Sequence, residues 1–331
     1  MAEQAIGAYG GRSRNGTHPT SGRATNGRGK STKPTTSSPK KYATSLSIDS
    51  RSKTELKPEL AEALLGLEKT LKMPMWLLVQ DGRQHDLCPH IEEVFFRARH
   101  DLPAGKPIAL FLESPGGSAS AAYAIAKLIQ KHCGSFVVVV AQWAKSAATL
   151  LSLGASQIII AEHAQLGPLD VQLDDPDREK TTSALDETQA LERLHAAALE
   201  ALDQTVLLLA RRTGKRIESI LPHAMRFASD LMRPLLEKVD VVQYTNKQRT
   251  LKVAEEYAVR LLAGRFPMDQ AKAMARHLVE KYPEHGFMID FDEARGIGLS
   301  VKEPTEEQNR YFDRILLHLD GLNAFGRVTR I

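Results

Sequence analysis

Two short segments, about thirty residues apart, carry side chains and main-chain groups that together could perform acyl transfer. The first is Phe111-Leu-Glu-Ser-Pro-Gly-Gly-Ser118 and the second is Ala144-Lys-Ser-Ala-Ala-Thr149. A glycine pair lets the main chain adopt positive φ and approach a ligand closely, so its amides can face a substrate. A serine nucleophile beside such amides is the minimum equipment for attack on an acyl carbon.

The elements around both segments indicate how the two turns come together. Ile108–Leu112 and Phe136–Gln142 read as buried strands, and Ala119–Lys131 and Ser146–Leu153 read as the helices that follow them. In a parallel sheet, consecutive strand-to-helix turns open at the same edge. We therefore expect the Gly-Gly turn and Ser146 to share one crevice.

Each segment alone also has an ordinary structural interpretation. Pro115-Gly-Gly117 is typical of a tight turn, and a serine before a helix is a favoured N-cap whatever the function. The conjunction of the two, in consecutive βα turns, is what favours the catalytic interpretation.

These residues resemble the superfamily of Clp-type peptidases, signal peptide peptidases and crotonases, and they are closest to the branch called serine dehydrogenase proteinases. The resemblance spans roughly 75–302 and is most specific from Ile108 to about Gln172. It implies an α/β fold of the Clp/crotonase ββα-superhelix type, with a parallel sheet, a long arm helix and C-terminal helices. The motifs that carry it are Glu113-Ser-Pro-Gly-Gly-Ser118, Ala144-Lys-Ser-Ala-Ala-Thr-Leu-Leu151, Leu153-Gly-Ala155, Leu166-Gly-Pro-Leu-Asp170 and, more weakly, Ala210-Arg-Arg-Thr-Gly-Lys215 and Asp292-Glu-Ala-Arg-Gly-Ile-Gly-Leu299.

The resemblance implies a serine endopeptidase in which Ser146 is the nucleophile. The oxyanion hole would be formed by the amide of Ala147 and by that of Gly116 or Gly117. A donor of this kind is worth roughly a hundred- to a thousandfold in rate, because it meets charge that develops only in the transition state. A peptide substrate would lie extended along the Gly-Gly segment as an added strand.

The general base departs from the Clp-type pattern. Clp-type peptidases carry a histidine on the strand after the serine helix, but 166–170 contains none, and His163 lies a few residues too early. Signal peptide peptidases use a lysine instead, and burial can lower a lysine pKa towards neutrality. Lys180, some thirty residues after the serine, is therefore the predicted base of a Ser-Lys pair.

Three observations leave the identity of the general base undecided. The surroundings of Lys180, Asp174-Asp-Pro-Asp-Arg-Glu-Lys180, also read as a solvated charged loop. Lys145 adjoins the serine, but adjacent side chains on a helix do not face each other. His285, within Tyr282-Pro-Glu-His-Gly-Phe287, is a further candidate, although a histidine there could simply support a turn.

Composition divides the chain into a tail and a domain. Residues 1–55 hold ten Lys/Arg against three Asp/Glu, a net charge of +7, so the remaining residues carry −3 of the total of +4. The tail is rich in Gly, Ser, Thr and Asn, and we expect it to be disordered. It could contact nucleic acid or anionic surfaces transiently, but a solubilising arm is the favoured interpretation. Residues 56–331 would form the peptidase domain with its helical C-terminal extension.

The rest of the sequence bears on location and cofactors. Two cysteines, Cys88 and Cys133, do not suggest a disulfide scaffold, and with no secretory signal or membrane span in view they favour a soluble cytoplasmic protein. The histidines form no metal-binding motif and no nucleotide-binding Walker motif occurs, so we expect no metal, no cofactor and no intrinsic ATP dependence.

The helical segments complete the expected architecture. Ala184–Arg212 reads as one long helix whose apolar stripe could pack on its own sheet or against another copy in a homo-oligomer. Val239-Asp-Val-Val-Gln243 reads as a β-run that could wall the site. Two other functions stay open: a crotonase-like acyl-CoA hydrolase, because the same pair of amides polarises thioesters, and an inactive peptide-binding scaffold, because the Clp-type histidine is missing.

Overall fold

The computed structural model describes residues 40–46, 53–82, 85–170, 172–175 and 180–331. For residues 172–175 and 180–188 it describes the backbone only. The segment from Lys40 to Ile331 forms one compact unit.

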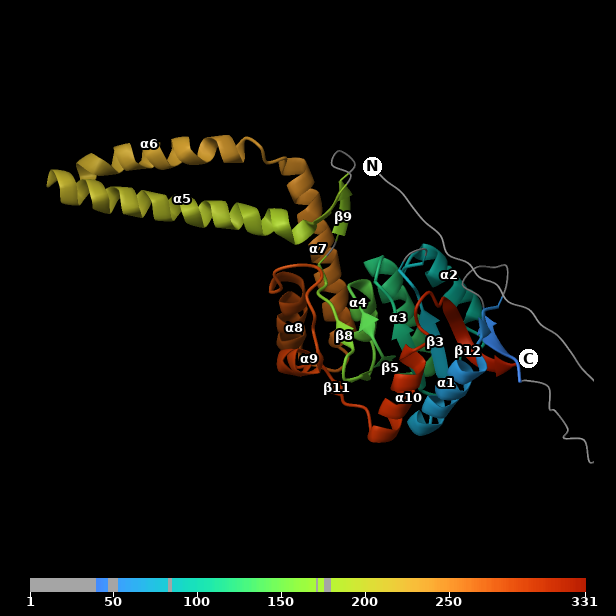
Figure 1. The fold of residues 1–331 in the computed structure, drawn as a ribbon. Helices are drawn as coiled ribbons and strands as arrows, with labels where there is room; N and C mark the ends of the chain where they lie inside the picture. The colour runs from blue at the N-terminus through green and yellow to red at the C-terminus, as the bar shows by residue number, and fades with distance from the viewer. Residues whose placement is uncertain (1–39, 47–52, 83–84, 171, 176–179) are drawn as a thin grey trace, which may run out of the picture. The chain divides into compact units, whose positions relative to one another are not determined.

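An eight-stranded mixed sheet lies at the centre of this unit (Figure 1). Its strand order is β11-β7-β5-β4-β3-β12-β1-β2, parallel from β11 to β3 and antiparallel from there on. Two small sheets accompany it, β6 with β8 in parallel and β9 with β10 antiparallel. The strands are β1 Tyr42–Leu46, β2 Glu55–Leu56, β3 Met75–Val79, β4 Ile108–Glu113, β5 Phe136–Val140, β6 Trp143–Ala144, β7 Gln157–Ile160, β8 Gln165–Leu166, β9 Gln172–Asp175, β10 Lys180–Ser183, β11 Val301–Lys302 and β12 Ala324–Arg330.

Helices connect the parallel strands and cover the sheet. α1 packs against α10, whereas α3 contacts α2, α4 and α7. The helices are α1 Pro58–Leu71, α2 Pro89–Ala98, α3 Ala119–Cys133, α4 Ala147–Ser152, α5 Ala184–Thr213, α6 Ile217–Leu236, α7 Val241–Leu262, α8 Met268–Glu280, α9 Phe291–Ile297 and α10 Glu306–Leu316.

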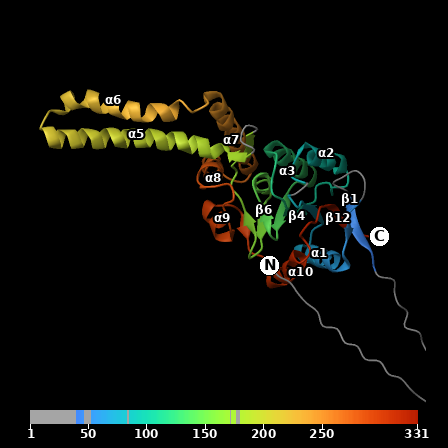
Figure 2. The ribbon, with the colours of Figure 1, turned by 45° about the horizontal axis from the view of Figure 1, so that its top comes forward.

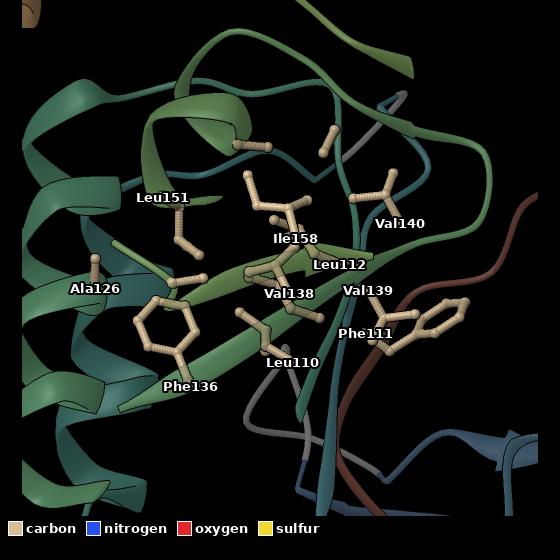
Figure 3. Close-up of a cluster of buried hydrophobic side chains, with 14 of the residues drawn as sticks. Leu110, Phe111, Leu112, Ala126, Phe136, Val138, Val139, Val140, Leu151 and Ile158 are labelled. Carbon is tan, nitrogen blue, oxygen red and sulfur yellow. The ribbon is translucent and has the colours of Figure 1, made fainter. Parts of the chain in front are cut away.

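The core explains why the central strands are apolar at almost every position. Leu110 of β4, Val138 of β5 and Ile158 of β7 are register partners and are buried. Figure 3 shows Phe136 beside Ala126 of α3 and Leu151 of α4, so these helices cover this face of the sheet. A parallel sheet buried on both faces is typically a near-continuous hydrophobic run, as here.

The helix α3 illustrates the local rules that fix these connections. Ser118 is its N-cap and accepts a hydrogen bond from the Ala121 amide at 3.3 Å. Buried residues then recur every three or four positions up to Cys133, and Gly134 ends the helix at a φ of 78°. A capped start, an apolar stripe and a positive-φ glycine are sufficient to define this helix.

A helical hairpin follows the two small strands β9 and β10. α5 and α6 run side by side and contact each other, and α5 also contacts α7 (Figures 1 and 2). The predicted β-run at 239–243 is wrong, because Val241 begins α7. Asp240 caps that helix by accepting hydrogen bonds from the amides of Val242 and Gln243, which overrides the β-propensity of the valines.

Two strands of the antiparallel part of the sheet lie where the sequence predicts none. β1, Tyr42–Leu46, falls within the segment predicted as a tail and pairs with both β12 and β2. β12, Ala324–Arg330, inserts between β1 and β3, and therefore joins the end of the chain to the parallel part of the sheet. The rest of the predicted tail, residues 1–39, lies outside the described residues.

The predicted α/β class, with its parallel sheet, long arm helix and C-terminal helices, is confirmed. In the described part of the chain, no helix has the length and apolar character needed to cross a bilayer.

Candidate active site

The Gly-Gly turn and Ser146 lie in contact. Gly116 and Gly117 have φ values of 109° and 128°, a region that only glycine adopts readily. A Cβ on Gly116 would lie 2.7 Å from both the Ser146 Cβ and the Lys145 carbonyl oxygen. The two turns thus meet at one edge of the sheet, as the sequence predicts.

The backbone pairing of the Gly-Gly turn decides which amides face the cleft. The Leu87 amide donates to the Gly116 oxygen at 2.6 Å, and the Ser118 amide donates to the Leu87 oxygen at 2.6 Å. In this parallel bridge the bonds on either side of Gly117 point to Leu87, so the N–H and C=O of Gly117 itself point the opposite way. Leu87 therefore occupies one edge of the turn, and the backbone groups of Gly117 on the other edge can pair with a ligand.

Two amides near the serine remain to meet a ligand. The Gly116 amide donates to the Ser114 Oγ at 3.2 Å. Among the described residues, no acceptor is found for the amides of Gly117 and Ala147. Of the two glycines predicted as alternatives for the oxyanion hole, Gly117 is the one with an uncommitted donor.

Ser146 itself has a strained backbone. Its φ of 49° and ψ of −118° make it one of two non-glycine residues with positive φ in the described part of the chain. Its hydroxyl makes no capping bond to α4, although the residue occupies the N-cap position. Such strain costs of the order of 1–3 kcal/mol and is concentrated at functional sites. The geometry favours a serine held for chemistry over one that only caps a helix.

A buried carboxylate at the end of β4 holds the segment that leads to the serine. Glu113, which is 2% exposed, accepts hydrogen bonds from the amides of Ala141, Gln142 and Trp143 at 2.6, 2.9 and 2.7 Å. Burial raises the pKa of Glu113 to about 8, and the three amide donors oppose that rise. This anchoring role was not predictable from the sequence, because nothing about a glutamate before Ser-Pro-Gly-Gly indicates that its side chain is buried.

A second set of hydrogen bonds joins the two turns directly. The Ser114 amide donates to the Trp143 oxygen at 3.1 Å, and the Lys145 amide donates to the Ser114 oxygen at 3.0 Å. The Ser114 hydroxyl in turn donates a hydrogen bond to the Gln80 Oε1 at 2.7 Å. The turn that carries the serine is therefore fixed to the turn that carries the glycines.

Ser146 opens onto a cleft of about 590 Å³. Both glycines, Ala147 and the start of α3 line one part of it, and α7 lines another. His285, from the segment between α8 and α9, also lines it. The cleft is lined by Gly82, Asp86, Pro115, Gly116, Gly117, Ser118, Ala119, Ser120, Ser146, Ala147, Leu150, Leu169, Thr250, Val253, Ala254 and His285.

Matches to known proteins fall on this region of the chain. Residues 89–233 match the family described as "ClpP-like SDH-type serine proteinase". The chain resembles Clp-like serine peptidases. The predicted relationship is thereby confirmed over that range, which includes the Gly-Gly turn, Ser146 and most of the α5–α6 hairpin.

The curated relatives are distant. The chain is 27% identical over 216 residues to a protein of Methanocaldococcus jannaschii named "Uncharacterized protein MJ0137", covering 65% of this chain and 60% of the relative. It is 22% identical over 232 residues to "Uncharacterized protein MJ1495" of the same organism, covering 70% and 64%. The chain thus spans less than two thirds of the length of either relative.

Two solved structures are similar at low scores. A mutant of ClpP1 from Listeria monocytogenes has a TM-score of 0.32 and 14% identity, with 73% of this chain and 98% of that chain covered. A mutant of the membrane-bound stomatin-specific protease 1510-N has a TM-score of 0.29 and 16% identity, with 70% and 98% covered.

The three candidates for the base, and His163, which the sequence places too early, occupy different places in the fold. Lys180 begins β10, paired with Asp175, and its side chain lies outside the described residues. The Lys145 amine donates to Gln165 Oε1 at 2.7 Å, and burial lowers its pKa, but Lys145 does not line the cleft. His163 is exposed and also lies outside the cleft lining. His285 does line it.

Proposed function

We propose that this protein is a serine peptidase that hydrolyses peptide bonds through an acyl-enzyme on Ser146. The observation that supports this proposal is the close approach of Gly116 to Ser146 and to the Ala147 amide, with Gly117 next in the chain carrying a second uncommitted amide. A nucleophile and two converging donors, at the wall of a cleft, are the parts that acyl transfer requires.

In the proposed mechanism the Ser146 Oγ attacks the carbonyl carbon of the scissile bond. The negative charge that develops on the carbonyl oxygen is stabilised by the amides of Gly117 and Ala147. The amine product leaves with the serine proton, and water then hydrolyses the ester of Ser146. A base is needed for both steps, and Lys180, His285 and Lys145 are its candidates.

The substrate is proposed to bind as an extended strand along Gly117. That residue directs its N–H and C=O away from Leu87, so a peptide can pair with the free edge of the turn. Backbone pairing recognises the chain rather than particular side chains, so selectivity would be modest. A homo-oligomeric assembly and a cytoplasmic location remain predictions.

A serine-directed fluorophosphonate tests this proposal on the full-length protein. Wild type should be labelled covalently at Ser146, Ser146→Ala should not be labelled, and Ser219→Ala, on α6 outside the cleft, should label like wild type. Absence of labelling in wild type would favour the inactive scaffold. Coenzyme A retained by the purified protein would favour the acyl-CoA hydrolase.

A further inference from the structure

We infer that His285, oriented by the carboxylate of Asp170, is the group that accepts the Ser146 proton and returns it to the leaving amine. The inference rests on the proposed function. It names the general base, which the proposed function does not specify. It differs from the predicted Ser-Lys pair in residue, chemistry and place in the chain.

The cleft itself selects His285. Among the residues that line it, Asp86 and His285 are the two with ionisable side chains able to accept a proton from a hydroxyl near neutral pH. Imidazole is the side chain most often used in this role, because its ordinary pKa lies near the pH at which cells work. No lysine of the described cleft lining competes with it.

A buried acid adjoins the histidine on the side away from solvent. The Asp170 side chain is 1% exposed, and its Oδ2 lies 3.9 Å from the His285 Nδ1. The His285 Nδ1 is fully buried, whereas the side chain as a whole keeps 22% of its exposure. The exposed part therefore belongs to the rest of the side chain, and we assign Nε2 to the side that faces the cleft.

This arrangement fixes the roles of the two ring nitrogens. A proton on Nδ1 faces the carboxylate, which leaves the lone pair of Nε2 for the cleft. The 3.9 Å separation is longer than a hydrogen bond, and such contacts often shorten only when substrate binds. Asp170 then acts as a positioning residue, because it touches the histidine and not the reacting atoms.

Two independent contacts hold the histidine loop against the serine side, and a third stiffens the loop itself. Leu166 and Ile289 exchange backbone hydrogen bonds of 2.8 and 3.1 Å. The amine of Lys145, the residue before the nucleophile, donates to the Phe287 oxygen at 3.2 Å. The Tyr282 and Phe287 rings lie 4.8 Å apart, which stiffens the loop between them.

Asp170 is held from the same direction. The amide of its neighbour Leu169 donates to the Leu278 oxygen of α8 at 2.8 Å, and Gly167 donates to the Thr149 Oγ1 of the serine helix at 3.0 Å. The segment that carries the acid thus bridges the serine helix and α8, after which the histidine loop begins. Serine, histidine and acid are joined through one continuous set of contacts.

The proposed proton transfers balance over one turnover. As Oγ forms its bond to the carbonyl carbon, Nε2 takes the hydroxyl proton, and the imidazolium formed is stabilised by Asp170. The imidazolium gives that proton to the amine nitrogen as the C–N bond breaks. In the second half, Nε2 takes a proton from the attacking water and returns it to Oγ as the ester bond breaks.

The rate of phosphonate labelling in the full-length protein tests the assignment. His285→Ala should lower it by about a hundredfold or more, the usual range for loss of a general base. Added imidazole should restore part of the rate in His285→Ala but none in Ser146→Ala, a rescue that a purely structural histidine would not show. His163→Ala, an exposed histidine outside the cleft, is the matched control and should label like wild type.

Asp170→Asn tests the positioning role. Alone it should lower the labelling rate, whereas in a His285→Ala background it should cause no further loss, because residues that act as a unit are not additive. Additive losses, or wild-type labelling in His285→Ala, would overturn the inference. Loss of labelling in Lys180→Ala with full labelling in His285→Ala would assign the base to the lysine. In each of these outcomes the wild-type protein is still labelled at Ser146. Failure of the proposed function would instead leave the wild-type protein unlabelled.

Discussion

The two sides of the candidate active site are built in different ways. The serine side is local: Glu113, the two glycines and Ser146 lie within about 35 residues and are joined by buried backbone hydrogen bonds. The histidine side comes from far along the chain and is held by a short bridge, a lysine and a ring contact. The proposed nucleophile and oxyanion donors are thus fixed by the sheet, whereas the proposed base depends on how the C-terminal helices pack.

The largest effect is expected at the point where the two turns touch. Gly116→Ala would place a methyl group against the Ser146 Cβ and the Lys145 oxygen, so it should displace the nucleophile and lower labelling by about a hundredfold or more. Gly105→Ala is the matched control: it also has positive φ, 66°, but nothing lies within 4 Å of the added Cβ. It should cost only about 1–2 kcal/mol of stability and leave labelling unchanged.

Next in size is removal of the buried carboxylate that anchors the serine segment. Glu113→Ala leaves the three amides of 141–143 without their acceptor, and each buried unpaired group costs about 1–3 kcal/mol. Urea unfolding should therefore show a loss of about 3 kcal/mol or more. Glu256→Ala, whose exposed carboxylate pairs with Lys252 at 3.5 Å on α7, should cost less than about 1 kcal/mol. Equal losses would show that Glu113 anchors nothing.

The pH dependence of stability tests whether Glu113 carries a proton in the folded protein. With a pKa raised from 4.5 to about 8 in the folded protein, the carboxyl keeps its proton in the folded state while the unfolded chain releases it. The contribution of Glu113 to stability should then be fully present below about pH 4.5, decline as pH rises and be lost above about 8. The thermal midpoint of wild type, measured against Glu113→Gln, reports this slope. The opposite slope would mean that the amide donors outweigh burial.

The smallest effect is expected where the two sides meet. Lys145→Met keeps the apolar stem but removes the amine that donates to the Phe287 oxygen, so the histidine loop loses one of its two contacts with the serine side. A charged hydrogen bond of this kind is worth about 1.5–3 kcal/mol, so labelling should slow by about tenfold while the serine side stays intact. Lys127→Met, an exposed lysine on α3 that pairs with Gln130, is the control. A loss equal to that of Ser146→Ala would instead make Lys145 itself the base.

Much of the serine side was predictable from local sequence. Strand β4, helix α3 and the glycine turn between them follow from an apolar run, a serine cap and a positive-φ pair, all within about 25 residues. The choice of Gly117 over Gly116 was not predictable. It depends on Leu87, which pairs with the turn from outside it and occupies one of its edges.

Two expectations from the sequence failed, one for the segment that begins α7 and one for the segment that contains β1. The valines at 239–242 indicate a strand, but Asp240 caps α7 and draws them into a helix. The strand β1 lies in a polar stretch and pairs along most of its length with β12, nearly 300 residues away, and only at two positions with the short neighbouring strand β2, so its local sequence does not predict it.

The sequence by itself determined which residues could be nucleophile and oxyanion donors, because turn chemistry and periodicity act over a few residues. Only the tertiary structure brought His285 to the cleft, placed the buried Asp170 beside it and buried Glu113 against the segment that leads to the serine. The physical reason is that side-chain neighbours across long sequence separations are set by the packing of whole helices against the sheet. That packing is a sum over many weak contacts which no short motif encodes.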